Sequence, residues 1–350
     1  MSLDLLILAI SFVLILAGAE LFTNGIEWFG RKLGLAEGAV GSVLAAVGTA
    51  LPETMIPIIA IVFASGAATT GIGIGAILGA PFMLATLAMF VTGAAVMWQA
   101  RHRPEGDVMP VDVGVLGLDM RTFAIAYGLA IGAAFLPIEP TWPKYVVAAA
   151  LVLIYGLYVK RHFEADPEVD LQDLAPLRFR HLDPLHRRNP GPPRLRVVNV
   201  QVFAALSFIV IGAIAFVGAV EHVASTLGVS EVLLALIVAP IATELPEKFN
   251  SIIWVRQGKD TLAMGNITGA MVFQASLPTV VALIFIPHEW AIGPGSYVAF
   301  ASAAIAFASA AVIFIPMVRR GRLTGRGLMV GGLFYMVYLA IVIAAILQPS

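Results

Sequence analysis

The chain of 350 residues contains no cysteine. This absence excludes disulfide bridges, thiolate metal sites and cysteine nucleophiles. Charged residues are scarce as well, at 12% of the chain, whereas soluble domains contain about 25%. The formal net charge of −1 offers no basic surface to a nucleic acid, so no nucleic-acid partner is expected.

Apolar residues take the place of the missing charges. They make up 59% of the chain, and the mean hydropathy is +0.92. Apolar runs of about 20 residues recur, which is the length that a helix needs to cross a hydrocarbon core of about 30 Å. The sequence therefore predicts an all-α polytopic membrane protein embedded in a lipid bilayer. Ten transmembrane helices are expected, at residues 3–24, 38–64, 72–98, 122–138, 143–159, 200–221, 231–255, 262–286, 295–317 and 327–347.

The basic residues predict how the chain is oriented. Of its 21 Lys and Arg residues, all but Lys144 and Lys248 fall in loops that the ten spans place on one side. Since Lys and Arg collect in cytoplasmic loops, this pattern predicts a plasma (inner) membrane protein with both termini outside.

Five spans in each half make the two halves enter the membrane from opposite sides. Residues 1–159 and 200–350 are therefore expected to form two inverted five-helix repeats, a common construction for secondary transporters. Residues 160–199 connect them as a cytoplasmic loop. His181 and His186 in this loop match no metal-ligand spacing, so a basic, solvated loop is expected rather than a metal site.

One sequence pattern occurs twice, at an offset of 194 residues. Residues 27–53 and 221–247 align with one another, and both end in Leu-Pro-Glu, at Glu53 and Glu247. A carboxylate inside an apolar span is costly and indicates a functional site. The glycines and alanines around it could serve close helix packing alone. Packing does not account for a glutamate after the proline in both copies.

The prolines of this pattern predict exposed backbone oxygens. Pro52 and Pro246 should break their helices and free the carbonyls four residues earlier. Hydroxyl and carboxylate oxygens lie close by, and ligand sets made only of oxygen suit hard cations such as Ca²⁺ and Na⁺. The predicted cation site contains Gly48, Thr49, Glu53, Ala242, Thr243, Glu244 and Glu247, with Glu53 and Glu247 as the metal ligands.

Lys248 has two alternative roles in this site. On a helix it lies four residues after Glu244, so the two side chains could pair and lower the cost of burial. If Lys248 faces the cavity instead, its ammonium group could take the place of one bound cation. The three glutamates and this lysine would balance one divalent ion, two monovalent ions or two protons. Because burial favours the neutral form of clustered carboxylates, H⁺ joins Na⁺ as a candidate coupling ion.

The two copies also resemble a known family. GTALPETM at residues 48–55 and ATELPEKFNS at residues 242–251 are similar to the two alpha repeats of the sodium/calcium exchanger superfamily of cation antiporters. The family form is G-T-S-L-P-E, followed one helix later by G-N-x-x-G-S-N-x-x-N/D. That second element is recognisable as GNITGAMVFQ at residues 265–274 and, much eroded, as GAILGAPFML at residues 75–84. The resemblance implies alternating access, with cations coordinated by the second, third, seventh and eighth helices. On the eighth, it implies that Asn266 and Gln274 line the cation site; interhelical hydrogen bonding is the alternative role for each.

Departures from the family form remove several oxygen ligands. The family serine is replaced by Ala50 in the first copy and by Glu244 in the second. The expected polar positions of the third helix hold Ala76, Ala80, Pro81 and Leu84, and those of the eighth hold Asn266, Ala270, Met271 and Gln274. The family's usual sodium-for-calcium stoichiometry is therefore not implied.

These observations favour a secondary-active antiporter that exports Ca²⁺ in exchange for Na⁺ and needs no cofactor. The alternatives are a Ca²⁺/H⁺ or other cation/H⁺ exchanger, and a transport-deficient homologue that only binds cations. An intramembrane enzyme is not expected, because the chain has no HExxH motif and its histidines fall in loops or at span ends.

Overall fold

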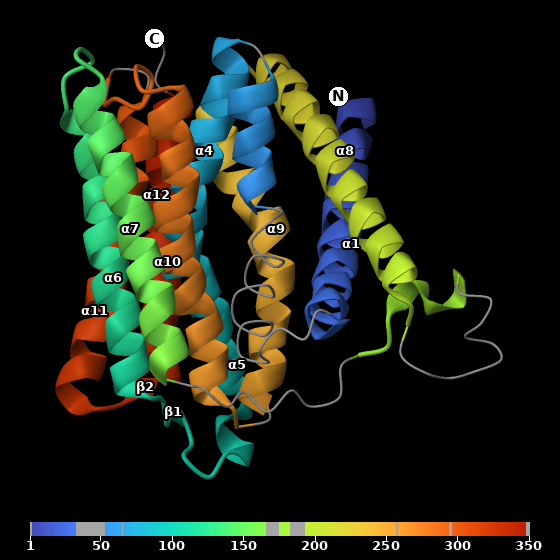
Figure 1. Cartoon of the computed structure of the whole chain (residues 1–350). Coiled ribbons are helices and arrows are strands. Elements are labelled where there is room, and N and C mark those ends of the chain that lie inside the picture. Colours follow the sequence, from blue (N-terminus) through green and yellow to red (C-terminus); the bar gives the residue numbers. More distant parts are fainter. Residues whose placement is uncertain are drawn as a thin grey trace.

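The computed structural model describes residues 2–32, 53–64, 66–165, 175–182, 193–256, 258–293 and 296–347. Nearly all of these residues are helical (Figure 1). The α-helices are α1 (Ser2–Lys32), α4 (Ala67–Met83), α5 (Met89–Gln99), α6 (Val113–Gly132), α7 (Trp142–Ala165), α8 (Leu195–Leu227), α9 (Glu231–Arg256), α10 (Asp260–Phe285), α11 (Tyr297–Arg320) and α12 (Gly325–Leu347). Two π-helical segments, η2 (Ile59–Phe63) and η3 (Leu84–Ala88), and three short 3-10 turns, η4 (Ala100–His102), η5 (Ala133–Phe135) and η6 (Arg178–Leu182), complete them.

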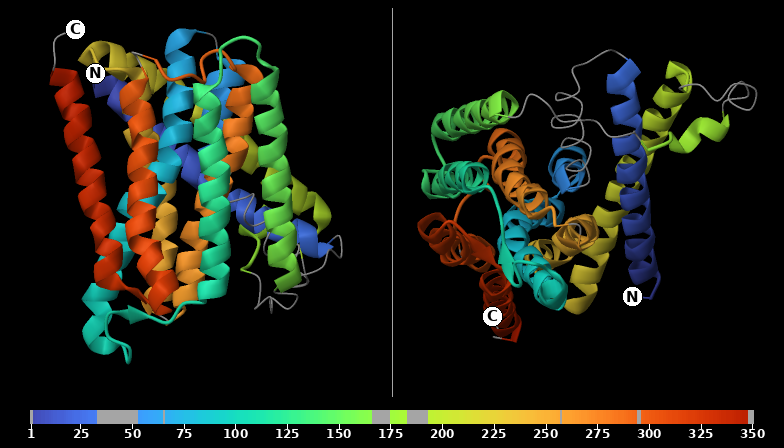
Figure 2. Two further views of the ribbon diagram at one scale, coloured as in Figure 1. Left: turned by 90° about the vertical axis from the view of Figure 1, so that its left-hand side faces the viewer. Right: turned by 90° about the horizontal axis from the view of Figure 1, so that it is seen from below.

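These helices confirm the predicted fold class. Eight of them are long and apolar enough to cross a membrane, and two shorter apolar helices, Glu53–Phe63 and Glu231–Ile241, occupy the second and seventh expected positions. Within the described residues, each of the ten expected spans is thus represented by a helix. The first residue of α1 and the last of α12 lie at the same end of the bundle, as an even number of crossings requires (Figures 1 and 2).

The fourth span begins earlier than predicted. Helix α6 starts at Val113, whereas the sequence placed the start at residue 122. Asp112 caps the helix, because its Oδ1 accepts hydrogen bonds from Gly114 N (2.8 Å) and Val115 N (3.1 Å). Arg121, expected in a loop, therefore lies within a helix.

The predicted break at Pro246 is also wrong. Helix α9 runs from Glu231 to Arg256 without interruption. A proline removes one hydrogen bond and clashes locally, but the bonds on either side can keep the helix continuous. The break expected at Pro52 lies outside the described residues.

Irregular helix geometry occurs instead in the first copy of the repeat. There the segments η2 and η3 are π-helical, a geometry that is often found at functional sites. The second segment follows Pro81, which cannot donate a backbone hydrogen bond. Ser309 Oγ of α11 donates to Ala85 O at 2.6 Å and so provides that carbonyl with a partner inside the bundle.

Glycines bring α4 into backbone contact with α9. A Cβ atom on Gly75 would lie 2.2 Å from Val232 O, and one on Gly79 would lie 2.2 Å from Leu236 O. The contact moves to higher residue numbers on both helices together, so α4 and α9 run parallel. The span that contains α4 is 83% buried, which makes it the most enclosed of the eight long spans. Close helix packing therefore explains these glycines, which was the alternative that the sequence offered for them.

Helices α1 and α8 form a pair at one side of the bundle (Figure 2). Glycines again permit the contact, since a Cβ on Gly18 would lie 2.9 Å from Ala205 O and one on Gly212 would lie 3.0 Å from Ser11 O. The pair packs against α9, α4 and η2 through α8 and, more lightly, through α1.

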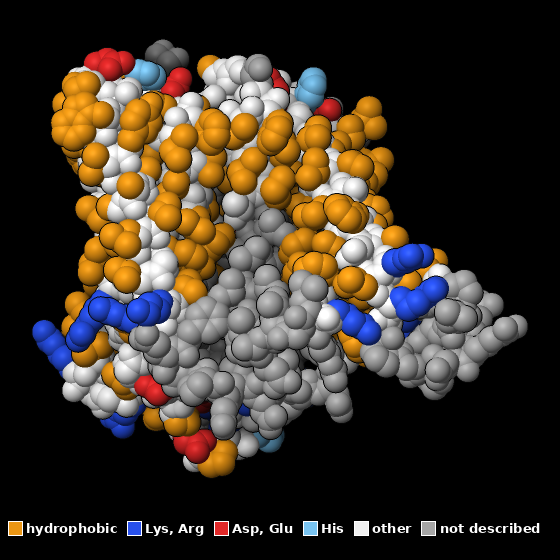
Figure 3. All heavy atoms as spheres, in the orientation of Figure 1, with side chains coloured by type: hydrophobic (Ala, Val, Ile, Leu, Met, Phe, Trp, Pro, Cys, Tyr) orange, Lys and Arg blue, Asp and Glu red, His pale blue; other side chains and the backbone are white. Residues whose placement is uncertain are grey.

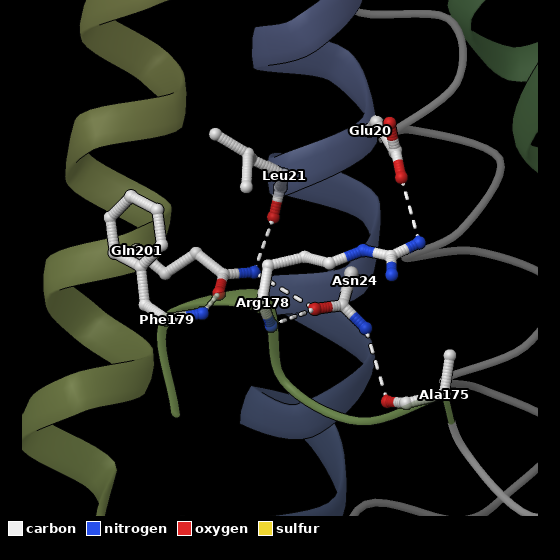
Figure 4. Close-up of polar contacts among 7 residues, drawn as sticks. All are labelled: Glu20, Leu21, Asn24, Ala175, Arg178, Phe179 and Gln201. Atoms are coloured by element: carbon white, nitrogen blue, oxygen red, sulfur yellow. Dashed lines mark hydrogen bonds and ion pairs between the residues drawn. The ribbon is translucent and has the colours of Figure 1, made fainter. Parts of the chain in front are cut away.

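Part of the connector between the two halves is docked onto this pair (Figure 4). Gln201 of α8 donates to Leu21 O (2.8 Å) and to Asn24 Oδ1 (3.0 Å), while its own Oε1 accepts from Phe179 N (2.8 Å). Asn24 of α1 also accepts from Arg178 N (3.0 Å). Gln201 is fully buried. Residues 175–182 are nevertheless largely exposed, His181 included, so the predicted solvated loop touches the α1–α8 pair through a few groups only.

Ion pairs and a short ribbon join the loops at the lower end of the bundle. Strand β1 (Val108–Met109) pairs antiparallel with β2 (Leu323–Thr324). Arg103 forms an ion pair with Asp260 and donates to Val255 O (3.0 Å). The hydrogen bond to Asp260 raises the pKa of Arg103 above its usual value, so the guanidinium stays charged at any physiological pH.

We predict that Gly79→Leu disrupts the α4–α9 contact. The new side chain would collide with the backbone of α9, which cannot move aside as a flexible side chain can. The variant should lose at least about 3 kcal/mol of stability or fail to fold. Thermal denaturation of the purified protein measures this. Gly128→Leu is the matched control, because a Cβ there meets nothing within 4 Å; equal melting temperatures for the two variants would contradict the prediction.

Candidate functional site

The helix that carries Glu53 runs antiparallel to α4. It ends at Phe63, and α4 begins at Ala67 after a short turn. A Cβ on Gly73 would lie 2.5 Å from Ile61 Cγ1 and 3.6 Å from Ala60 Cβ. Since Glu53 precedes Ile61 by eight residues, it lies about 12 Å further along the helix. That distance places it level with Pro81 of α4.

A hydrogen bond fixes the register of α9 against α10. Asn266 Nδ2 of α10 donates to Ser251 Oγ of α9 at 3.5 Å, and Ser251 Oγ donates to Ala263 O at 3.2 Å. The short link between them makes the helices antiparallel. Thr243 and Gln274 each lie eight residues from this hydrogen bond, or about 12 Å in the same direction. Both residues therefore lie at one level.

The two registers bring three buried polar residues into one layer. The contact of Gly79 with Leu236 and Pro240 places Thr243 within about one helical turn of the level of Glu53. Glu53 is 7% exposed, and Thr243 and Gln274 are each 2% exposed. They come from both halves of the chain, as a site between inverted repeats requires. We call this arrangement the polar layer.

The oxygens of the polar layer are chemically suited to a cation. Thr243 Oγ1 donates its proton to Ala239 O at 3.1 Å, which leaves its lone pairs available as acceptors. Gln274 makes no hydrogen bond with the described part of the chain, and its amide oxygen is a further acceptor. With the carboxylate of Glu53, three kinds of hard oxygen ligand lie at one depth.

The third helix contributes no oxygen side chain at this depth. Ala76 packs with Ile56 and Ala60 of the Glu53 helix and with Ala239 of α9. The remaining eroded positions, Ala80, Pro81 and Leu84, are buried as well. Apolar contact therefore fills the positions where the family form places polar ligands.

The other predicted site residues fall into two groups. Asn266 lies about 12 Å below the polar layer. Its side chain forms the hydrogen bond that joins α10 to α9. Glu247 lies on α9 one turn past Thr243, between the polar layer and that bond. The side chains of Ala242, Glu244, Glu247 and Lys248 lie outside the described part of the structure, and so do Gly48 and Thr49 altogether.

A buried carboxylate that the sequence did not reveal contacts α10 below the polar layer, near the level of Asn266. Asp119 of α6 is 1% exposed and accepts hydrogen bonds from Tyr158 Oη of α7 (3.0 Å) and Thr268 Oγ1 of α10 (2.5 Å). It thus ties α10, which carries Gln274, to two outer helices. The sequence placed Asp119 in a loop. The cap at Asp112, followed by an apolar run, is the signal that would have placed it in a helix.

Comparison with known proteins decides the family. The family model for sodium/calcium exchanger proteins matches residues 3–161 and 198–347, which is most of the chain. The chain belongs to the sodium/calcium exchanger family. Members of this family are transporters of inorganic cations in membranes, and not enzymes. The two matched ranges also correspond to the two halves that contain the repeated pattern.

Individual relatives of this exchanger are distant in sequence and similar in fold. A curated protein of Alkalimonas amylolytica, named "Putative antiporter CaxA", is 24% identical over 300 residues, covering 84% of this chain and 85% of the relative. The crystal structure of the H⁺/Ca²⁺ exchanger CAX has a TM-score of 0.71 at 17% identity, covering 99% of this chain and 82% of that one. The sodium–calcium exchanger NCX_Mj has a TM-score of 0.56 at 15% identity, covering 97% and 98%. These likenesses establish the polytopic inverted-repeat fold.

We predict that Asp119→Ala destabilises the exchanger. It would remove the carboxylate that accepts from the buried Tyr158 hydroxyl, at a cost of about 1–3 kcal/mol, whereas Thr268 Oγ1 can still donate to Met264 O (3.1 Å). Thermal denaturation in detergent measures the loss. Asp119→Asn retains a carbonyl oxygen and should lose less than Asp119→Ala. If both variants melt with the wild type, the carboxylate does not hold α10 in place.

Proposed function

We propose that this exchanger is a secondary-active antiporter that exports Ca²⁺ by alternating access around the polar layer. The observation that carries the proposal is the burial of Glu53 at the level of Thr243 and Gln274, deep in the apolar bundle. An ionisable residue at such a depth in a membrane protein indicates a functional site. Glu247, one turn away on α9, is proposed as the second carboxylate of the site.

H⁺ is the coupling ion that this site favours. Two carboxylates neutralise one Ca²⁺, and two protons can neutralise the same carboxylates on the return step. Na⁺ would need additional oxygen ligands, and the third helix offers only Ala76, Ala80, Pro81 and Leu84 at the family's polar positions. The likeness to an H⁺/Ca²⁺ exchanger agrees with this assignment and extends over 99% of the chain.

Exchange of Ca²⁺ for Na⁺ is the second candidate. The family model is that of sodium/calcium exchangers, and Thr243 and Gln274 supply neutral oxygens that Na⁺ accepts. A transport-deficient cation-binding homologue is the third. The retention of Leu-Pro-Glu in both copies of the pattern argues against a loss of transport.

We further propose that the basic end of the bundle faces the cytoplasm of the plasma (inner) membrane. The Lys and Arg side chains visible in Figure 3 lie in the lower half of the molecule, below most of its apolar surface. That distribution follows the rule for inner-membrane proteins. Both termini then lie outside, and the halves 1–159 and 200–350 rock against each other across the connector 160–199.

We predict that Glu53→Gln and Glu247→Gln each abolish transport. The neutral amide keeps the size of the side chain but cannot balance the charge of a divalent ion. Ca²⁺ flux into liposomes that contain the purified exchanger should fall at least about a hundredfold, since removal of one partner of a buried charge costs several kcal/mol. Glu105→Gln, at an exposed carboxylate, should transport as the wild type does. Flux that persists in either variant would exclude that glutamate from the site.

A second experiment distinguishes the coupling ions. If H⁺ is exchanged, a pH gradient should drive Ca²⁺ uptake in Na⁺-free liposomes, and Ca²⁺ addition should release protons that a trapped dye detects. If Na⁺ is exchanged, only an outward Na⁺ gradient should drive uptake. Measurable Ca²⁺ binding without flux under either gradient would favour the transport-deficient alternative.

A further inference from the structure

A groove lies between α6 and α11, away from the polar layer. It has a volume of about 370 Å³, and all but two of its lining residues are apolar or glycine. On α6 it runs along Gly117 and Ala124, which share one helix face, and on α11 along Ala311 and Phe314. The groove opens to the outside of the bundle, since Ile315 and Val318 on its wall are 49% and 52% exposed.

The small residues of the groove do not serve helix packing. At close helix contacts in this chain a Cβ on glycine would meet backbone, as at Gly75 and Gly79, whereas a Cβ on Gly117 meets nothing within 4 Å. The space above Gly117 is therefore open. In a bilayer, an apolar space that opens outward at this depth is filled by hydrocarbon chains.

Two arginines line the groove at different heights, Arg121 one turn above Gly117 on α6 and Arg319 in the last turn of α11. Arg121 of α6 and Arg319 of α11 both line it, and both are exposed. Neither forms a hydrogen bond or an ion pair with any part of the chain that the structure describes. Two other arginines at the lower end of the bundle have acidic partners, Arg103 with Asp260 and Arg326 with Asp107.

The two arginines approach one another from antiparallel helices. Strand β1 precedes α6 and pairs with β2, which follows α11, so the start of α6 is held beside the end of α11. Side chains on a helix lean toward its N-terminus. The Arg121 side chain therefore leans down toward the start of α6, and the Arg319 side chain leans up toward Arg121. The groove thus has an apolar floor and two guanidinium groups that lean toward one another in its lower part.

We propose that this groove binds one anionic phospholipid. The acyl chain lies on the apolar floor, and the two guanidinium groups hold the phosphate of the headgroup by charge-assisted hydrogen bonds. Basic pockets between helices on the cytoplasmic side recognise anionic headgroups in this way. The inference requires that the exchanger spans a membrane, but it does not depend on which cations are exchanged.

Native mass spectrometry of the detergent-purified full chain tests the proposal. Phosphatidylglycerol should be retained, and phosphatidylcholine with the same acyl chains should be retained far less. Inorganic phosphate should not bind and should not compete, which excludes a simple anion site. The double variant Arg121→Gln/Arg319→Gln should weaken phosphatidylglycerol retention roughly 25-fold, at about fivefold for each juxtamembrane basic residue. Gly117→Leu should abolish retention by filling the groove.

Matched controls separate this site from the general attraction of lipid to basic residues. Arg161→Gln removes an exposed arginine of α7 outside the groove lining, and Gly128→Leu adds the same side chain to an open face of α6 elsewhere. Both should retain phosphatidylglycerol as the wild type does. Equal retention of the two lipids, or unchanged retention in the double arginine variant, would overturn the proposal.

The same experiment covers the other possible occupant of the groove. A dimer that dissociates in Gly117→Leu would show that a second copy of the chain fills the groove and would also overturn the proposal. Failure of the lipid site is distinguishable from failure of the proposed transport function. Glu53→Gln should lose Ca²⁺ flux and keep phosphatidylglycerol, whereas the groove variants lose the lipid irrespective of the ions exchanged.

Discussion

The backbone contact between α4 and α9 is the constraint on which the rest of the structure depends. Gly75 and Gly79 allow α4 to lie against the carbonyls of α9 with no side chain between them. That contact fixes the axial register of the third helix against the seventh. Because the Glu53 helix folds back along α4, the same contact sets the depth of Glu53 against Thr243. The polar layer thus follows from glycine packing as much as from the polar residues themselves.

The two copies of the repeat contribute unequally to this layer. The first copy supplies Glu53 and two π-helical segments, while its third helix is apolar at the family's polar positions. The second copy has regular helices and supplies Thr243 and Gln274, together with the position of Glu247. Inverted symmetry therefore governs the path of the chain and not the chemistry of the site. This inequality is the ground on which we propose H⁺ rather than Na⁺ as the coupling ion.

Polar contacts outside the layer join helices and loops that are distant in sequence. Asp119 links α10 to α6 and α7, and Gln201 and Asn24 join the connector to the α1–α8 pair. Each of these side chains is buried and forms hydrogen bonds across elements far apart in sequence. Hydrogen bonds of this kind are expensive to leave unmade in an apolar interior. They favour one arrangement of helices over other arrangements that bury the same apolar area.

The all-α membrane class, the approximate span positions and the inverted halves follow from the sequence alone, which also indicates Glu53 as a candidate site residue. These follow from local properties, namely apolar length, the side on which Lys and Arg fall, and a pattern repeated at a fixed offset. Tertiary structure decided the continuity of α9 through Pro246, the docking of residues 175–182 and the burial of Asp119. It also placed Gln274 in the polar layer and Asn266 below it. The physical reason is that each of these depends on a neighbour distant in sequence, whose depth only helix packing fixes.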